Sequence, residues 1–471
     1  MDKPYSIRKW ITSLLVIVLG WSSGQSPAAE ADDTAPWRVS KAVGAPGWLD
    51  VSGTHRTRYE TLDGQFRLGR SGGDQVLAMR TLLKLVAKTE SFRVVGEVMD
   101  SRQELADVGT PINTTIVNAA ELLQGYAAVR LEGPFLDGSH SELRLGRETI
   151  DLGSRRLVAR NRFRNTINSF TGLDYQWEVQ GGPVARAFYV LPTKRMPYDV
   201  SSLLNNDVQF DEENFDFQFW GFHLEMPEPL LDGNVEAYFF GMHESDSPGW
   251  PTANRRLFTP GLRWSRQPAN GGWHYDFEGI VQFGSQRASI LPGDTRDLDH
   301  FAYFAHGEVG YRLDALWSPL LTVLFDYASG DDSPTDDRSN RFDTLFGARR
   351  FEHGPTGIYG AFARSNIQSP GVRLSCEPVK SLQAMACYRP YWLASKRDAW
   401  TTSRLRDPSG NSGSFVGHQL EAMLRWTILP GNLRFEVGGA YLFAGEFIRS
   451  VPSAIERGDT AYGYASLDLT F

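Results

Sequence analysis

Apolar and polar side chains alternate along most of the chain from residue 74 onwards. In the first such segment one parity is apolar and the other is basic: Leu77, Met79, Leu83, Leu85 and Ala87 against Arg80, Lys84 and Lys88. The pattern recurs over residues 123–131, 273–283, 301–313 and 420–426. A period of two is typical of a β-strand with one apolar face. The pattern therefore predicts an all-β fold built from many strands.

A soluble β-sandwich alternates in the same way, so two further features separate it from a membrane barrel. Several apolar faces end in aromatic residues, as the interfacial girdle of a membrane barrel requires: Trp177, Trp264, Trp273, Tyr311, Trp392, Trp426 and Tyr441. The opposite faces carry many charges, which a dry core does not tolerate when they are unpaired. An apolar outside and a polar inside predict a transmembrane β-barrel.

The connections between the alternating segments fall into two classes. The short ones cover residues 88–90, 133–140, 180–183, 227–233, 267–272, 314–319, 377–381 and 428–432. The long ones cover residues 101–121, 147–169, 192–214, 243–255, 329–363, 394–415 and 446–460. Short periplasmic turns and long extracellular loops are usual in outer-membrane barrels. The pairing predicts an antiparallel barrel of about eighteen strands, wide enough for an aqueous channel, between Trp48 and Phe471.

The two ends of the chain indicate export. Basic residues, a short apolar run over residues 10–20 and small residues up to Ala29 predict a secretory signal peptide at residues 1–29. The run is too short to remain as a membrane-spanning helix. Residues 30–47 are predicted to form a short periplasmic tail, and residues 48–471 the barrel in the bacterial outer membrane, in contact with lipid and lipopolysaccharide. The terminal Phe471 resembles the signal that directs such proteins to the barrel assembly machinery.

The charge of the chain is unevenly distributed. The formal net charge is −8, yet one short segment holds seven arginines: Arg144, Arg147, Arg155, Arg156, Arg160, Arg162 and Arg164. An arginine that faces lipid at mid-depth costs roughly 2–4 kcal/mol, so these side chains are expected in the lumen or in a loop. In a soluble protein the cluster would suggest a solvated basic loop or a nucleic-acid patch, and the barrel pattern argues against a nucleic-acid partner.

Further charges fall at positions predicted to face the lumen. The basic ones are Arg80, Lys84, Arg130, Arg364, Arg373, Arg389, Arg425 and Arg434. Acidic residues that could hold them in place are Glu97, Glu142, Asp174, Glu178, Asp326 and Glu436. Two interpretations stay open for each arginine: a group that meets an anionic substrate, or half of a structural ion pair that fills the lumen.

Catalytic and metal-binding signals are weak. The sequence lacks the serine-hydrolase, zinc-protease and phosphate-loop motifs, so no enzyme and no cofactor are predicted, with an outer-membrane hydrolase as a distant alternative. Asp331, Asp332, Asp336 and Asp337 are predicted on an outward-facing loop, where they are either solvated or share Ca²⁺ with lipopolysaccharide. Cys376 and Cys387 fall on opposite faces of the predicted wall, so two free thiols are expected.

Two segments resemble a known family. GRETIDLGSRRLVARNRFRNTINSFTG (residues 146–172) and residues 341–374 look like signature segments of the alginate-export family of outer-membrane porins, and the resemblance extends to FDYASGDD (residues 325–332) and to the C-terminal strand. The resemblance implies a monomeric eighteen-stranded barrel with an arginine-rich constriction, which passes an anionic uronate polymer from periplasm to exterior. The residues expected at this constriction are Arg80, Arg130, Glu142, Arg144, Arg155, Arg156, Arg160, Asp326, Arg364 and Arg373.

One feature departs from the family. In the members that export alginate, a long periplasmic loop near the C-terminal end guards the inner mouth, whereas the corresponding turn here, residues 428–433, is short. Gating, the identity of the polymer and the periplasmic secretion complex therefore stay open. An anion-selective uptake porin for small acidic sugars or oligouronates is the main alternative.

Overall fold

The computed structural model describes residues 36–230, 232–291, 293–333 and 335–471. The predicted signal peptide and the first part of the predicted tail lie outside the described residues. Apart from Pro36, the described residues belong to one compact unit, Trp37–Phe471.

Within the described residues, the unit contains eighteen long strands and one strand of two residues. Their bounds are β1 (Leu49–Asp63), β2 (Asp74–Lys88), β3 (Phe92–Glu104), β4 (Asn118–Glu132), β5 (Ser139–Glu148), β6 (Phe170–Val179), β7 (Val184–Pro192), β8 (Phe217–Leu230), β9 (Gly233–Glu244), β10 (Arg256–Arg266), β11 (Gly272–Arg287), β12 (Asp297–Arg312), β13 (Leu320–Ala328), β14 (Arg338–Ser339), β15 (Ile367–Val379), β16 (Leu382–Trp392), β17 (Phe415–Leu429), β18 (Leu433–Ala444) and β19 (Thr460–Thr470). Four short helices accompany them: α2 (Val39–Ala42), α3 (Val200–Leu204), α4 (Arg350–His353) and α5 (Glu446–Ser450). No helix among these residues is long and apolar enough to cross a bilayer.

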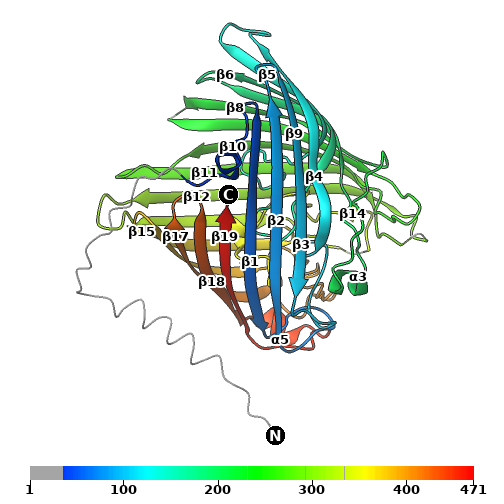
Figure 1. Ribbon diagram of the computed structural model, residues 1–471. Helices are drawn as coiled ribbons and strands as arrows, with labels where there is room; N and C mark the ends of the chain where they lie inside the picture. Colours follow the sequence, from blue (N-terminus) through cyan, green and yellow to red (C-terminus); the bar gives the residue numbers. More distant parts are fainter. Residues whose placement is uncertain (1–35, 231, 292, 334) are drawn as a thin grey trace. The chain divides into compact units, whose positions relative to one another are not determined.

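The long strands form a closed antiparallel barrel. Each pairs with its neighbours in the sequence, and β19 pairs with β1 through a register that runs from Thr54 opposite Thr470 to Asp63 opposite Ala461. Figure 1 shows β19, in red, between the orange β18 and the dark blue β1. The two-residue β14 lies in a loop and pairs in parallel with β12. The predicted antiparallel barrel of about eighteen strands is confirmed.

The two faces of the wall follow the alternation in the sequence. On β2, Leu83 and Leu85 are exposed, whereas Ala78, Arg80 and Leu82 are buried on the inner face. Outward leucines, valines and phenylalanines recur on the other strands and form the apolar surface that lipid requires. Near the short-turn end, Trp273 packs edge-on against Tyr311 with ring centroids 5.1 Å apart, as expected of an interfacial girdle.

Short and long connections lie at opposite ends of the barrel. Residues 89–91 join β2 to β3, and residues 430–432 join β17 to β18, whereas residues 149–169 and 393–414 form long loops. Short turns mark the periplasmic end of such a barrel. Next to the last short turn, the side-chain amide of Asn432 accepts a hydrogen bond from Trp37 N (2.9 Å) and donates one to Trp37 O (2.8 Å).

The long loops fold into the barrel and fill part of its lumen. Residues 149–169 meet residues 340–366 at a parallel bridge between Val158 and Phe346, and both segments contribute to the buried apolar core. In that core Phe362 stacks on Tyr391 with ring centroids 3.6 Å apart. The lumen therefore has an outer part packed with loop residues and an inner part that stays hollow.

Both cysteines are free thiols, as expected. Cys387 is buried and pairs across the sheet with Arg373, while Cys376 lies opposite Ala384.

Candidate functional site

The hollow part of the lumen is a cavity of about 1040 Å³ at the short-turn end of the barrel. Its wall comes from the inner faces of β1, β2, β3, β15, β16, β17, β18 and β19, and residues between 151 and 167 and between 348 and 356 close it on the loop side. Ser52, Asn432 and Thr470 mark the rim next to the short turns. The cavity thus extends from the periplasmic rim to the inserted loops.

The lining is strongly basic. Twelve basic side chains line it: Arg56, Arg58, Arg80, Lys84, Arg155, Arg160, Arg162, Arg164, Arg350, Arg373, Arg425 and Arg434. The acidic side chains are four: Glu97, Asp151, Glu436 and Asp468. The lining therefore has an excess of eight positive charges, twelve minus four, whereas the whole chain carries a net charge of −8. Such a concentration of one sign raises the local concentration of anions.

Two wall arginines bind the backbone of the inserted loop. Arg56 Nη1 donates to the carbonyl oxygens of Arg162 (2.9 Å) and Phe163 (3.0 Å), and its Nη2 donates to that of Arg164 (2.9 Å). Arg80 Nη1 donates to the same oxygen of Arg164 (2.9 Å). These acceptors are neutral, and neither Arg56 nor Arg80 forms an ion pair among the described residues. Both guanidinium charges are therefore left to act on the cavity.

The other arginines at the loop side are partly compensated. Arg160 Nη2 lies 2.7 Å from Glu97 and its Nη1 donates to Thr149 Oγ1 at 2.6 Å. Arg373 Nη2 donates to Phe351 O at 2.7 Å, and its Nη1 lies 3.5 Å from Glu308.

Arg155 differs from these partly compensated arginines. Its guanidinium lies over the ring of Phe351, 5.2 Å from the centroid. Among the described residues its side chain forms neither an ion pair nor a hydrogen bond, so, as at Arg56 and Arg80, no carboxylate neutralises its charge.

A second group of charges is buried between the loops and the wall. Glu352 of α4 is contacted by both Arg156 and Arg364, and Arg156 also contacts Glu278 and lies 3.1 Å from Asp276. Burial would raise the pKa of Glu352, but the two guanidinium groups outweigh it and lower the pKa to about 2. Burial lowers the pKa of Arg156, and the surrounding carboxylates raise it above its ordinary value. This group is a dry ion network with its charges already paired.

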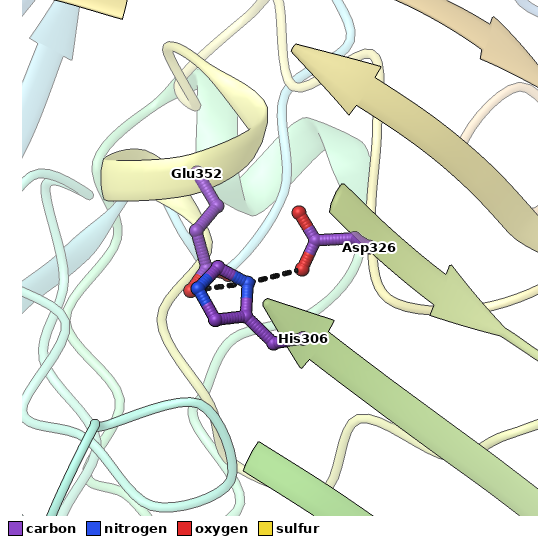
Figure 2. A group of neighbouring side chains, drawn as sticks. All are labelled: His306, Asp326 and Glu352. Atoms are coloured by element: carbon purple, nitrogen blue, oxygen red, sulfur yellow. Dashed lines mark hydrogen bonds and ion pairs between the residues drawn. The ribbon is translucent and has the colours of Figure 1, made fainter. Parts of the chain in front are cut away.

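The same network contains a possible metal-binding geometry. His306, Asp326 and Glu352 place one ligand atom each within 4.8 Å of one another, and Figure 2 shows the three side chains converging from β12, β13 and α4. His306 Nδ1 lies 2.8 Å from Asp326 and 4.0 Å from Glu352. Arg389 lies 2.8 Å from Asp326, so three arginines (Arg156, Arg364 and Arg389) already serve the two carboxylates. A divalent cation would meet repulsion from all three, and the donor set fits guanidinium groups instead.

A third group lies in the wall around β5. Arg144 contacts Glu142 (2.5 Å), Glu148 (3.3 Å) and Asp174 (3.5 Å). Arg130 is exposed and pairs with Glu132 at 2.9 Å. Each of these arginines has a carboxylate partner.

The residues predicted for the constriction are therefore divided among three places. The cavity is lined by Arg80, Arg155, Arg160 and Arg373; the buried network contains Arg156, Asp326 and Arg364; the β5 region contains Arg130, Glu142 and Arg144. The sequence reasoning missed Arg56, Arg58 and Arg350, which line the cavity. A signal for the first two was present, because Arg56 and Arg58 are two positions apart and so share a face of one strand.

The comparisons with known proteins agree with this architecture. A family model described as alginate export matches residues 47–458. Among solved structures, Pseudomonas aeruginosa OccK8 (OprE) is similar at 11% sequence identity and a TM-score of 0.56, covering 90% of this chain and 98% of that chain. Pseudomonas aeruginosa OpdK with vanillate is similar at 13% and 0.54, covering 90% and 99%. Pseudomonas aeruginosa OccK2 (OpdF) in complex with glucuronate is similar at 13% and 0.53, covering 90% and 98%. No curated protein is similar in sequence to this chain.

Proposed function

The chain belongs to the alginate export family and is an outer-membrane β-barrel channel, and we propose that it passes an anionic polysaccharide of the alginate type through an arginine-lined lumen. The proposed direction is secretion, from the periplasm to the exterior. Family and fold point to a channel rather than to an enzyme.

The excess of eight positive charges in the cavity lining carries this proposal. A polyuronate presents one carboxylate on every sugar, and guanidinium groups bind carboxylates through two parallel hydrogen bonds while staying charged at any working pH. Conduction requires several weak sites rather than one tight site, so that the polymer is passed on. The requirement is met by an array of arginines whose partners are either neutral carbonyl oxygens or carboxylates that neutralise only part of the charge.

The proposed roles follow from how each arginine is compensated. Arg80 and Arg155 lack a carboxylate partner and are the proposed primary contacts of the polymer, while Arg160 and Arg373 add weaker contacts because Glu97 and Glu308 compete for them. The buried network and the β5 group are proposed to position the loops and the wall. Export also requires a periplasmic secretion complex that delivers the polymer to the rim near Asn432.

Uptake of small acidic sugars is the second candidate. It is favoured by the similarity in fold to OccK2, whose structure is a complex with glucuronate, and to OpdK, whose structure contains vanillate. Both ligands carry a carboxylate, which the same arginines would bind. The loops that fill the outer part of the lumen narrow the path, and a narrow path admits a monomer more easily than a polymer.

Planar-bilayer recordings on the purified protein test the proposal. We expect anion selectivity in a salt gradient, and block of the small-ion current by an alginate oligomer but not by a neutral oligosaccharide of the same length. Selectivity should weaken at high salt, because the Debye length falls from about 10 Å at 0.1 M to about 3 Å at 1 M. A cation-selective channel would overturn the proposal. Block by glucuronate with no block by the oligomer would favour uptake.

A further inference from the structure

The lipid-facing surface of the barrel contains a groove. It has a volume of about 440 Å³, and residues of five neighbouring strands, β5 to β9, line it. Leu173, Tyr189 and Phe222 in this lining are exposed on the outer face of the wall. In a membrane barrel that face is in contact with lipid. The groove is therefore continuous with the apolar surface that lipid covers.

The groove exists because a small side chain lies between large ones. On the outer face, Ala187 of β7 pairs with Tyr175 of β6 and with Phe222 of β8. Trp220, two residues before Phe222 on the same face of β8, packs against Phe239 with ring centroids 5.8 Å apart. Ala187 is thus the floor of the groove, and the larger side chains of β6 and β8 are its sides.

The two ends of the groove differ. Tyr189 follows Ala187 on the same face of β7 and lies at the end towards the middle of the barrel wall. At the end towards the short turn, the next residue on that face is Ala185, which pairs with Trp177. No bulky side chain of β7 therefore closes the groove on the side of Trp177, an aromatic residue of the predicted interfacial girdle.

The depth of the groove in the membrane follows from strand geometry. A strand rises about 3.3 Å per residue and is tilted by about 35–45°, so two residues span about 5 Å of depth. Tyr175 is two residues and Leu173 four residues from Trp177, which places the groove about 5–10 Å from the level of Trp177. Because the apolar band of such a barrel is about 25 Å tall, the groove lies in its periplasmic half. The lipids of that leaflet are phospholipids, whereas lipopolysaccharide occupies the other leaflet.

The lining suits an uncharged, linear ligand. Asp174 is the one charged residue among the described residues that line the groove, and its carboxylate is fully buried and lies 2.6 Å from Arg186. Apolarity alone does not favour the groove over the rest of the lipid face, because lipid chains are as apolar as leucine. Packing does, since a chain in the groove contacts the floor and both sides, whereas a chain on a flat surface contacts protein on one side only. The broad wall of a second barrel would bridge over the groove and leave it empty.

We propose that this groove binds one acyl chain of a phospholipid from the periplasmic leaflet. The chain lies on Ala187 between the side chains of β6 and β8, and the headgroup lies at the membrane interface near Trp177. The site is on the outer face of the wall, so it is independent of what passes through the lumen.

Native mass spectrometry of the protein extracted from vesicles of phosphatidylethanolamine and phosphatidylglycerol tests the site. The wild type should retain one phospholipid. In Ala187→Phe the retained fraction should fall about tenfold, because the new ring occupies the groove and replaces the contacts of the chain. Ala422→Phe is the matched control, because Ala422 is also exposed but pairs with Ala386 and Gly439, which provide no sides for a groove. It should retain lipid like the wild type. The heat-modifiable gel band shows that each variant is folded before it is compared.

Three results would overturn the proposal. Equal retention by the wild type and Ala187→Phe would mean that lipid surrounds the barrel without a preferred site. Retention of lipopolysaccharide in place of phospholipid, from vesicles that contain both, would place the bound chain in the other leaflet. A mass of two protein chains in the wild type, reduced to one chain in Ala187→Phe, would show that the groove is a contact between two copies.

Discussion

Arg156 in the loop between β5 and β6 contacts Glu352 in α4, 196 residues further along the chain, and neither side chain is more than 3% exposed. This ion pair joins the two loops that occupy the lumen. Because Glu352 also contacts Arg364, and Arg156 also contacts Glu278, the pair lies at the centre of a closed set of charges. Removing one member of such a buried pair strongly destabilises the folded protein, because the other charge stays buried without its partner.

Replacing Arg156 by glutamine should destabilise the folded protein. The substitution leaves the carboxylates of Glu278 and Glu352 buried with less compensation, and breaking a buried pair in this way costs about 3–5 kcal/mol. The measurement is the urea midpoint of the purified protein in lipid vesicles, followed by the shift between folded and unfolded bands on gels.

A matched control for that experiment is Arg162→Gln, because the Arg162 side chain is 71% exposed and pairs with Asp151 at the surface of the cavity. It should leave the midpoint almost unchanged. Equal midpoints for the Arg156 and Arg162 variants would show that the buried network does not stabilise the loops. Of the two interpretations that the sequence left open for the lumen-facing arginines, the burial of Arg156 and Arg364 beside Glu352 favours the structural ion pair.

Acid should weaken the same network in two steps. Burial lowers the pKa of His353 from 6.5 to about 3, so the neutral form is favoured in the folded state. That contribution is complete above pH 6.5 and is lost as the pH falls towards 3. The pKa of Glu352 is lowered from 4.5 to about 2, so its contribution is complete above pH 4.5 and is lost as the pH falls towards 2. Urea midpoints measured from pH 8 to pH 2.5 should therefore fall throughout the acid range.

A variant separates the two groups. Glu352→Gln removes the carboxylate, so the part of the decline that lies below about pH 4.5 should become smaller, while the part assigned to His353 remains. A pH profile that the substitution leaves unchanged in shape would exclude Glu352 as the titrating group. The variant will also be less stable at neutral pH, so the comparison is made between the slopes of the two profiles.

Arg155 should influence ion selectivity without affecting stability. A unit charge about 10 Å from a permeating ion in water contributes about 0.4 kcal/mol, which favours an anion and disfavours a cation, so the permeability ratio changes by about 0.8 kcal/mol, or about fourfold. Arg155→Gln should therefore reduce the anion preference by up to about fourfold, and Arg155→Glu should reduce it further, as measured by reversal potentials in a KCl gradient. Leu83→Ala, on the lipid face of β2, is the control and should leave the preference unchanged.

The sequence predicted the fold well because the relevant information is local. A period of two, an aromatic at the end of a strand and the length of a connection are each visible within a few residues, so the direction of Leu83 and Arg80 follows without any knowledge of distant partners. In an antiparallel barrel of this class, each strand also pairs with the strands that come before and after it in the chain.

The site was less predictable because pairing depends on the path of the loops. Arg155 and Arg156 are adjacent and chemically identical, yet one faces the cavity and the other is enclosed by three carboxylates. The difference arises where the loop meets residues 340–366, far away in the sequence. Asn168 is a similar case, because its Oδ1 accepts a hydrogen bond from Arg195, which lies in a different loop.

Arg56 and Arg80 should act through geometry as well as through charge. Together they donate to the backbone oxygens of Arg162, Phe163 and Arg164, which ties the inserted loop to β1 and β2. A lysine at either position keeps the positive charge, but its single ammonium group cannot reproduce the planar fork that reaches neighbouring carbonyl oxygens. The double variant Arg56→Lys with Arg80→Lys should therefore keep the anion preference, while fluctuations of the single-channel current increase because the loop is released.

The corresponding double glutamine variant should lose both properties. Glutamine removes the charge and is also too short to reach the loop, so we expect a lower anion preference together with the increased fluctuations. Arg434→Lys is the matched control, because Arg434 also lines the cavity but donates no hydrogen bond to residues 162–164. Its side chain is 46% exposed, and its Nη2 lies 3.6 Å from Asp468 Oδ1. If the current of the lysine variant fluctuates no more than that of the wild type, these arginines act on the lumen through their charge and not through their hydrogen bonds to residues 162–164. A lysine variant that loses anion preference would instead mean that the position of the loop determines selectivity, because the charge of the wall would be unchanged.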